Sequence, residues 1–151
     1  QLLGVFNRNL TETIACVLRD LGSERAMVVC GPDHVDELVT TGANQVSELR
    51  DGQVRTYEIN PRDYGFSFAS LDELGGGTPE FNASIVRSVL EGRATPARQD
   101  VVVLNAAAAL YVAGAANDLR AGIQMAQESI HSGSALDKLN RLVEMTNRFA
   151  A

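Results

Sequence analysis

The chain has 151 residues, and 13 Lys and Arg side chains against 19 Asp and Glu give a formal net charge of −6. This acidic balance argues against general nucleic-acid or anionic-membrane binding, because no positive excess is present to neutralise phosphate groups. The apolar share of 45% is ordinary for a globular protein, and the length supports one compact domain with its own core. No run of 18 apolar residues occurs, so no transmembrane helix is expected.

The sequence begins with Gln rather than Met, inside the apolar run Gln1–Phe6, and it carries no signal-peptide pattern. We therefore expect the chain to begin partway through a longer protein. Cys16 and Cys30 are too few for a disulfide framework, and His34 and His131 beside them do not make a zinc site. The small number of cysteines favours a location in the reducing cytoplasm.

The N-terminal part predicts a strand, a helix and a second strand. Leu2–Phe6 is typical of a short buried strand, and Asn9 begins a helix with Glu12 at capping-box spacing. Gly22 is the expected end of that helix, and the apolar run Ala26–Cys30 predicts a buried strand. This order indicates parallel pairing of the strands with a helical crossover. The predicted buried face of the helix consists of Leu10, Ile14, Val17, Leu18 and Leu21.

After a polar loop over residues 31–41, the pattern changes to an antiparallel hairpin. Its strands are Gln45–Arg50 and Gln53–Ile59, joined by Asp51-Gly52, a turn pair that tolerates positive φ at both positions. Residues 61–78 are irregular apart from a short helix start at Ser70–Glu73.

The last third of the chain predicts helices. A Thr-Pro pair at 78–79 opens the first. The apolar run 100–116 predicts one long buried helix, although residues 101–104 alone could also form a strand. Asp118 and Ser134 begin two more helices. Residues expected to pack inward are Phe81, Ile85, Val86, Val89, Leu90, Leu119, Ile123, Ala126, Ile130, Leu136, Leu139, Leu142, Val143 and Phe149. The predicted fold is α/β, with a parallel βαβ core, an antiparallel β-hairpin and a helical C-terminal third.

The loop that follows the second strand carries the most chemistry. Asp33, Asp36 and Glu37 place three carboxylates at the carboxyl end of a strand, where open α/β sheets bind ligands. Carboxylate oxygens suit Mg²⁺, which usually keeps water and substrate phosphates in its remaining positions. The spacing alone favours a simpler interpretation, in which these residues cap a short helix and interact with its dipole.

Two further stretches have a chemical and a structural interpretation. Gly75–Pro79 could form a phosphate cradle before a helix, but it lacks the lysine and the spacing of a P-loop, so a capped loop is favoured. Cys30 could be a nucleophile, but a small apolar residue at a strand end is favoured.

The order of motifs resembles that of the anthranilate phosphoribosyltransferase family. The resemblance covers nearly the whole chain, and its most specific parts are the alanine-rich stretch after Asn105 and the Asp-Glu pair after the second strand. The matching segments are Gln1–Phe6, Val28–Gly31, Asp36–Leu38, Ala69–Leu71, Asn82–Ala83, Val89–Leu90, Val103–Gly114 and Ser132–Ala135.

This family transfers a phosphoribosyl group from phosphoribosyl pyrophosphate to the amine of anthranilate, in tryptophan biosynthesis. The resemblance implies that Asp36 and Glu37 bind Mg²⁺ at the pyrophosphate. It also implies that residues 1–151 are the C-terminal portion of a larger phosphoribosyltransferase and nucleoside-phosphorylase-like catalytic domain. The family's glycine-rich phosphate loop, its anthranilate-binding segment and its N-terminal helical domain, through which it forms homodimers, would then lie upstream, and the isolated chain is expected to be inactive.

The loop departs from the family in two places. Cys30-Gly31 stands where the family usually has His-Gly, and His34 lies in the stretch where it has a further glycine. Two alternatives remain open: a non-catalytic assembly module, and a relative of pyrimidine nucleoside phosphorylase, which shares the broader architecture.

Overall fold

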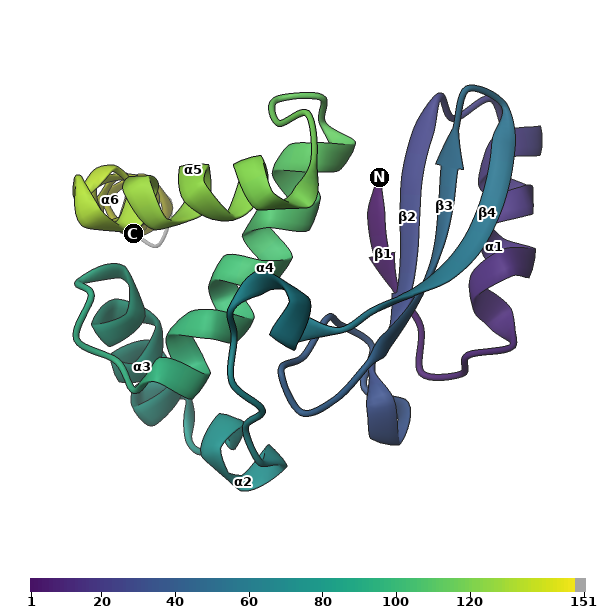
Figure 1. Ribbon diagram of the computed structural model, residues 1–151. Coiled ribbons are helices and arrows are strands. Elements are labelled where there is room, and N and C mark those ends of the chain that lie inside the picture. The colour runs from purple at the N-terminus through teal and green to yellow at the C-terminus, as the bar shows by residue number, and fades with distance from the viewer. Residues whose placement is uncertain (149–151) are drawn as a thin grey trace.

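The computed structural model describes residues 1–148 and contains a four-stranded sheet with six α-helices (Figure 1). Phe149, expected to pack inward, lies outside the described residues. Two short 3₁₀ turns occur at Pro32–His34 and Pro61–Tyr64. The elements in chain order are β1 (Leu2–Gly4), α1 (Leu10–Asp20), β2 (Arg25–Cys30), β3 (Asn44–Arg50), β4 (Gln53–Ile59), α2 (Leu71–Leu74), α3 (Pro79–Leu90), α4 (Pro96–Val112), α5 (Leu119–His131) and α6 (Ser134–Asn147).

The sheet has the strand order β1-β2-β3-β4. β1 pairs in parallel with β2, which confirms the predicted βαβ core, and β3 and β4 form the predicted antiparallel hairpin. Asp51 and Gly52 turn the hairpin with φ of 51° and 74°, as an Asp-Gly turn requires. β2 also pairs with β3 in an antiparallel manner, so the hairpin extends the same sheet as the βαβ unit.

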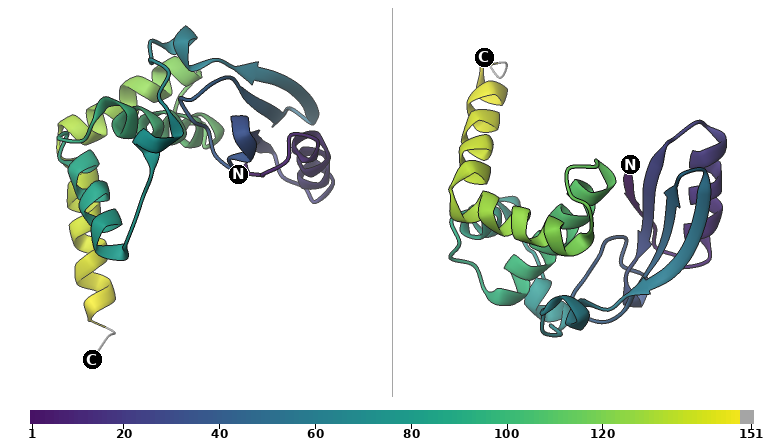
Figure 2. Two further views of the ribbon diagram at one scale, coloured as in Figure 1. Left: turned by 90° about the horizontal axis from the view of Figure 1, so that it is seen from below. Right: turned by 45° about the horizontal axis from the view of Figure 1, so that its top comes forward.

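The two faces of the sheet are covered by different helices (Figures 1 and 2). Met27 and Val29 of β2 join the larger core with α4 and α5, whereas Ala26 and Val28 join the smaller core with α1. Burial on both faces explains why β2 is apolar at every position after Arg25.

The C-terminal helices pack beside the sheet on the α4 side. The apolar run after residue 100 continues the helix that begins at Pro96, so the helical interpretation of 101–104 is confirmed. A Cβ placed on Gly122 of α5 would lie 2.6 Å from the carbonyl oxygen of Ala107 in α4, which shows how closely these two helices approach. α6 turns away from α5 and runs beside α3, where Arg87 donates to Asn140 Oδ1 at 3.4 Å (Figure 2).

Several details of the predicted faces and caps are wrong. In α1 the buried residues are Thr11, Ala15 and Leu18, whereas Val17 and Leu21 are exposed. Asn9 makes no side-chain cap; its N–H instead donates to Asn7 Oδ1 at 3.0 Å.

The predicted packing in the last helices is confirmed only in part. In α5 all four expected residues are buried. In α3 only Val89 is fully buried, and Phe81 and Val86 remain exposed. α6 has no fully buried residue. None of the helices in the described part of the chain is long and apolar enough to cross a membrane.

Candidate functional site

The acidic loop, residues 31–41, follows β2 and lies at the carboxyl ends of β1 and β2 (Figure 1). Its first part is a 3₁₀ turn at Pro32–His34, closed by the Gly31 N–H donating to the Val35 carbonyl at 2.7 Å. Asp36 and Glu37 come directly after this turn, and both side chains are exposed. The structure therefore presents the predicted pair to solvent at the edge of the sheet where ligands bind in open α/β folds.

Two glycines allow the main chain of this pair to approach the strands. A Cβ on Gly4 of β1 would lie 1.5 Å from the carbonyl oxygen of Asp36. A Cβ on Gly31 would lie 2.9 Å from the carbonyl oxygen of Glu37 and 2.8 Å from Val39 Cγ2. Any side chain at either position would displace the loop, because main-chain atoms cannot yield as the end of a side chain can.

The next two residues, Leu38 and Val39, are buried but belong to no strand or helix. Asn105 of α4 accepts a hydrogen bond from the Leu38 N–H at 3.1 Å and donates to the Leu38 carbonyl at 2.6 Å. Asn44 does the same for Val39, at 2.8 and 2.9 Å. The main chain that follows the acidic pair is therefore fixed by two side-chain amides.

The turn before the pair has an unusual main-chain conformation. Asp33 and His34 have φ of 56° and 64°, in the left-handed region that favours glycine. His34 Nδ1 lies 2.9 Å from the Phe6 carbonyl oxygen and makes a hydrogen bond to it. The loop thus adopts a glycine-like conformation in the stretch where the resemblance expects glycine, and a side-chain contact helps to hold it.

The donor chemistry of the pair fits a partly hydrated magnesium ion. Partial burial raises the pKa of Glu37, and the neighbouring Asp36 carboxylate raises it further, as expected for two carboxylates placed close together. No cluster of three or more His, Cys, Asp or Glu side chains suited to a metal occurs within residues 1–148. Two carboxylates fit Mg²⁺, which commonly takes only one or two from the protein and completes its shell with water and phosphate oxygens.

The other sequence candidates have structural roles. The Gly77 N–H donates to Asn82 Oδ1 at 2.8 Å, and Thr78 accepts from the Phe81 N–H, so 75–79 is the favoured capped loop. Cys30 is fully buried, and this burial raises the pKa of its thiol. A buried thiol of raised pKa is a poor nucleophile, which agrees with its interpretation as a small apolar residue.

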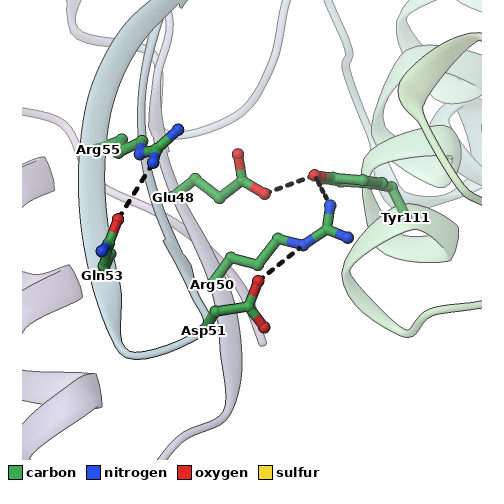
Figure 3. A pocket seen from close by; sticks show the side chains of 6 residues that line it. All are labelled: Glu48, Arg50, Asp51, Gln53, Arg55 and Tyr111. Atoms are coloured by element: carbon green, nitrogen blue, oxygen red, sulfur yellow. Dashed lines mark hydrogen bonds and ion pairs between the residues drawn. The ribbon is translucent and has the colours of Figure 1, made fainter.

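A polar pocket of about 510 Å³ lies at the opposite end of the sheet, between the β3–β4 hairpin and α4 (Figure 3). Tyr111 of α4 donates to Glu48 Oε1 at 2.6 Å and accepts from Arg50 Nη1 at 2.9 Å. Tyr57 donates to the other oxygen of Glu48 at 2.9 Å. The residues that line the pocket are Glu48, Arg50, Asp51, Gln53, Arg55 and Tyr111.

This arrangement joins the hairpin to α4. Arg25 and Arg50 are paired across β2 and β3, and their guanidinium carbons lie 5.3 and 5.9 Å from the centre of the Tyr111 ring. Burial raises the pKa of Tyr57 well above its ordinary value, and Glu48 adds to the shift. Because the central carboxylate and both phenols are already paired with one another, we assign the pocket a structural role.

Comparison with known proteins identifies the family. The sequence model of the glycosyl transferase family, a/b domain, matches residues 1–136. Anthranilate phosphoribosyltransferase of Acetivibrio thermocellus is 52% identical over 149 residues, covering 99% of this chain and 43% of that protein. The enzyme of the same name from Symbiobacterium thermophilum is 49% identical over 151 residues, covering 100% of this chain and 44% of that protein.

Solved structures agree with the sequence comparison. Anthranilate phosphoribosyltransferase from Thermus thermophilus superposes with a TM-score of 0.84 at 38% identity, over 93% of this chain and 41% of that one. The Saccharomyces cerevisiae enzyme in complex with PRPP and Mg gives 0.83 at 25% identity, over 95% and 41%. The chain spans less than half the length of these relatives. With 136 of its 151 residues matched, the chain belongs to the glycosyl transferase family, a/b domain.

Proposed function

We propose that this chain is the C-terminal portion of the catalytic α/β domain of an anthranilate phosphoribosyltransferase of tryptophan biosynthesis. The main support is that relatives of that name match nearly the whole chain at about 50% identity. The reaction would move a phosphoribosyl group from phosphoribosyl pyrophosphate to the anthranilate amine, forming a C–N bond and releasing pyrophosphate.

Asp36 and Glu37 are the residues of this chain to which we assign chemistry. Their carboxylates would hold Mg²⁺ against the pyrophosphate, where a bound cation offsets the negative charge that develops on the leaving group. The Mg-containing yeast structure supports this assignment at the level of the family. The part played by the chain itself is to hold the two carboxylates at the edge of the sheet, on the main chain packed against Gly4 and Gly31.

The rest of the active site belongs to other segments in this proposal. The phosphate loop, the anthranilate-binding segment and the helical domain for dimerisation would precede residue 1. Residues 1–151 alone are then expected to be inactive, and the complete enzyme would be a homodimer in the cytoplasm. A complementary N-terminal polypeptide should restore turnover when mixed with residues 1–151. A complex without turnover would instead support a non-catalytic assembly module.

The metal assignment is tested by replacing both carboxylates, Asp36→Asn with Glu37→Gln, in the complete enzyme. We expect anthranilate consumption to require a much higher Mg²⁺ concentration, because both protein ligands lose their charge. Asp33→Asn is the matched control: it changes an exposed carboxylate of the same loop and leaves the pair intact. An unchanged Mg²⁺ titration in the double variant would refute the assigned role. Consumption of a nucleoside and phosphate by the wild type, with none of anthranilate, would favour a phosphorylase.

A further inference from the structure

The main chain that follows the acidic pair is hydrogen-bonded as it would be in a β-sheet, but its partners are side-chain amides and not a neighbouring strand. Leu38 and Val39 each have both main-chain polar groups bonded to one carboxamide, that of Asn105 and that of Asn44 respectively. A primary amide offers a carbonyl acceptor and an N–H donor side by side, as a neighbouring strand would. Since both residues are buried, four main-chain groups would lose these partners without the two asparagines.

Each asparagine is itself oriented by further bonds. Asn105 Nδ2 also donates to the Val101 carbonyl of its own helix at 2.9 Å. Asn44 Nδ2 also lies 3.2 Å from the Gly42 carbonyl oxygen. The two carboxamides therefore come from different elements, α4 and the start of β3, and meet on adjacent residues of one loop.

Four consecutive residues of the loop are thus fixed in different ways. The carbonyl of Asp36 lies against Gly4 and that of Glu37 against Gly31. Leu38 is bonded to Asn105 and Val39 to Asn44. The carboxylates remain exposed while their main chain is held, which is the arrangement expected of ligands that must be in place before a cation arrives.

We propose that Asn105, supported by Asn44, is a positioning residue for the Asp36–Glu37 site. It contacts no reacting atom in this proposal; it acts by holding the peptide that follows Glu37. This inference rests on the proposed metal-binding function. Asn105 is expected to matter more than Asn44, because it bonds the residue adjacent to the pair.

The test measures two properties. One is the hydrogen exchange of main-chain amides, and the other is the binding of Mn²⁺ alone, monitored by the paramagnetic broadening of amide signals. In the wild type, the amides of Leu38 and Val39 should exchange slowly although they lie outside regular structure. Asn105→Ala should accelerate exchange at Leu38 and weaken Mn²⁺ binding by about 10- to 100-fold, the usual loss when a partner of a metal ligand is removed. Asn105→Asp keeps an acceptor for the Leu38 N–H and should give a smaller loss.

Asn82→Ala is the matched control. Asn82 makes the same pair of amide bonds to Gly77, at 2.8 and 3.2 Å, in the loop before α3. This variant should leave Mn²⁺ binding and the exchange of Leu38 unchanged. Equal Mn²⁺ affinity in the wild type and in folded Asn105→Ala, or fast exchange at Leu38 in the wild type, would overturn the proposal.

The two proposals fail in different ways. If Mn²⁺ broadens the same signals in the wild type and in Asp36→Asn with Glu37→Gln, the metal assignment itself is wrong and the positioning role falls with it. If only the double variant loses the broadening and Asn105→Ala retains it, the metal assignment stands and the inference about Asn105 is refuted.

Discussion

The contact between Gly4 and Asp36 makes a quantitative prediction about stability. In Gly4→Ala, the new Cβ would lie 1.5 Å from the Asp36 carbonyl oxygen and 2.5 Å from its carbonyl carbon. Cβ contacts below 3.0 Å are essentially absent from proteins, so the loop has to retreat by at least about 1.5 Å. A movement of that size would break the bonds of 3.1 and 2.6 Å between Leu38 and Asn105.

The expected cost follows from these two effects. Overpacking costs about 1–3 kcal/mol, and each buried main-chain group left without a partner costs about 1–3 kcal/mol. One overpacking term and two such main-chain groups add to about 3–9 kcal/mol, a large part of the ~5–15 kcal/mol by which domains are usually stable. Urea unfolding followed by circular dichroism suits a chain without tryptophan, and the midpoint should fall with little change in slope.

Gly75→Ala is the control for this measurement. Gly75 has φ of −55°, and its Cβ would lie 3.3 Å from the Asp72 carbonyl oxygen, so the substitution should change stability by no more than ~0.5 kcal/mol. If Gly4→Ala also stayed within ~1 kcal/mol of the wild type, the loop would not depend on this close approach, and the reasoning would be refuted.

Two further predictions concern the junction between the hairpin and α4. Tyr111→Phe keeps the ring beside Arg25 and Arg50 but removes the hydroxyl that bonds Glu48, so the free energy of unfolding should fall by about 1–3 kcal/mol. In a double-mutant cycle with Glu48→Gln, additive losses of unfolding free energy would contradict this. Burial raises the pKa of Tyr57 in the folded state, so above pH ~10 the unfolded chain binds fewer protons than the folded one. The stability that depends on this proton should be fully present below pH ~10 and decline above it. The part of the tyrosinate absorbance that Tyr57→Phe removes should therefore appear together with alkaline unfolding, and its appearance in the folded protein at pH ~10 would contradict the assignment.

Local sequence signals predicted most of the elements but fewer of the buried faces. The Asp51-Gly52 turn and the Asp118 cap depend on neighbouring residues only, and both are found where the sequence places them. The buried face of α1 differs from the predicted one because Thr11 is buried. Its hydroxyl accepts hydrogen bonds from Gln45 Nε2 at 2.7 Å and from Ser47 Oγ at 2.9 Å. A pattern that counts apolar residues cannot find a buried helical threonine whose hydrogen-bond partners lie in a strand more than 30 residues away.

The same limit applies to the candidate site. The acidic pair is a local cluster directly after a strand, and the family resemblance predicts that this cluster binds Mg²⁺. Gly4 and Asn105, which hold its main chain, lie 32 and 67 positions from the residues they contact, so no local spacing reveals them. The one local signal is Asn105 itself, a polar side chain in the middle of the apolar run 101–110 of α4.

The left-handed pair Asp33–His34 also bears on how such a loop changes during evolution. Outside glycine this conformation costs about 1–2 kcal/mol per residue, and the bond between His34 and the Phe6 carbonyl offsets part of that. A glycine at position 34 would adopt the same conformation without that bond, so the turn would not depend on the position of the Phe6 carbonyl. With histidine at position 34, positions 6 and 34 become epistatic. A substitution that shifts the main chain at Phe6 would also break the hydrogen bond from His34 that stabilises the turn before Asp36.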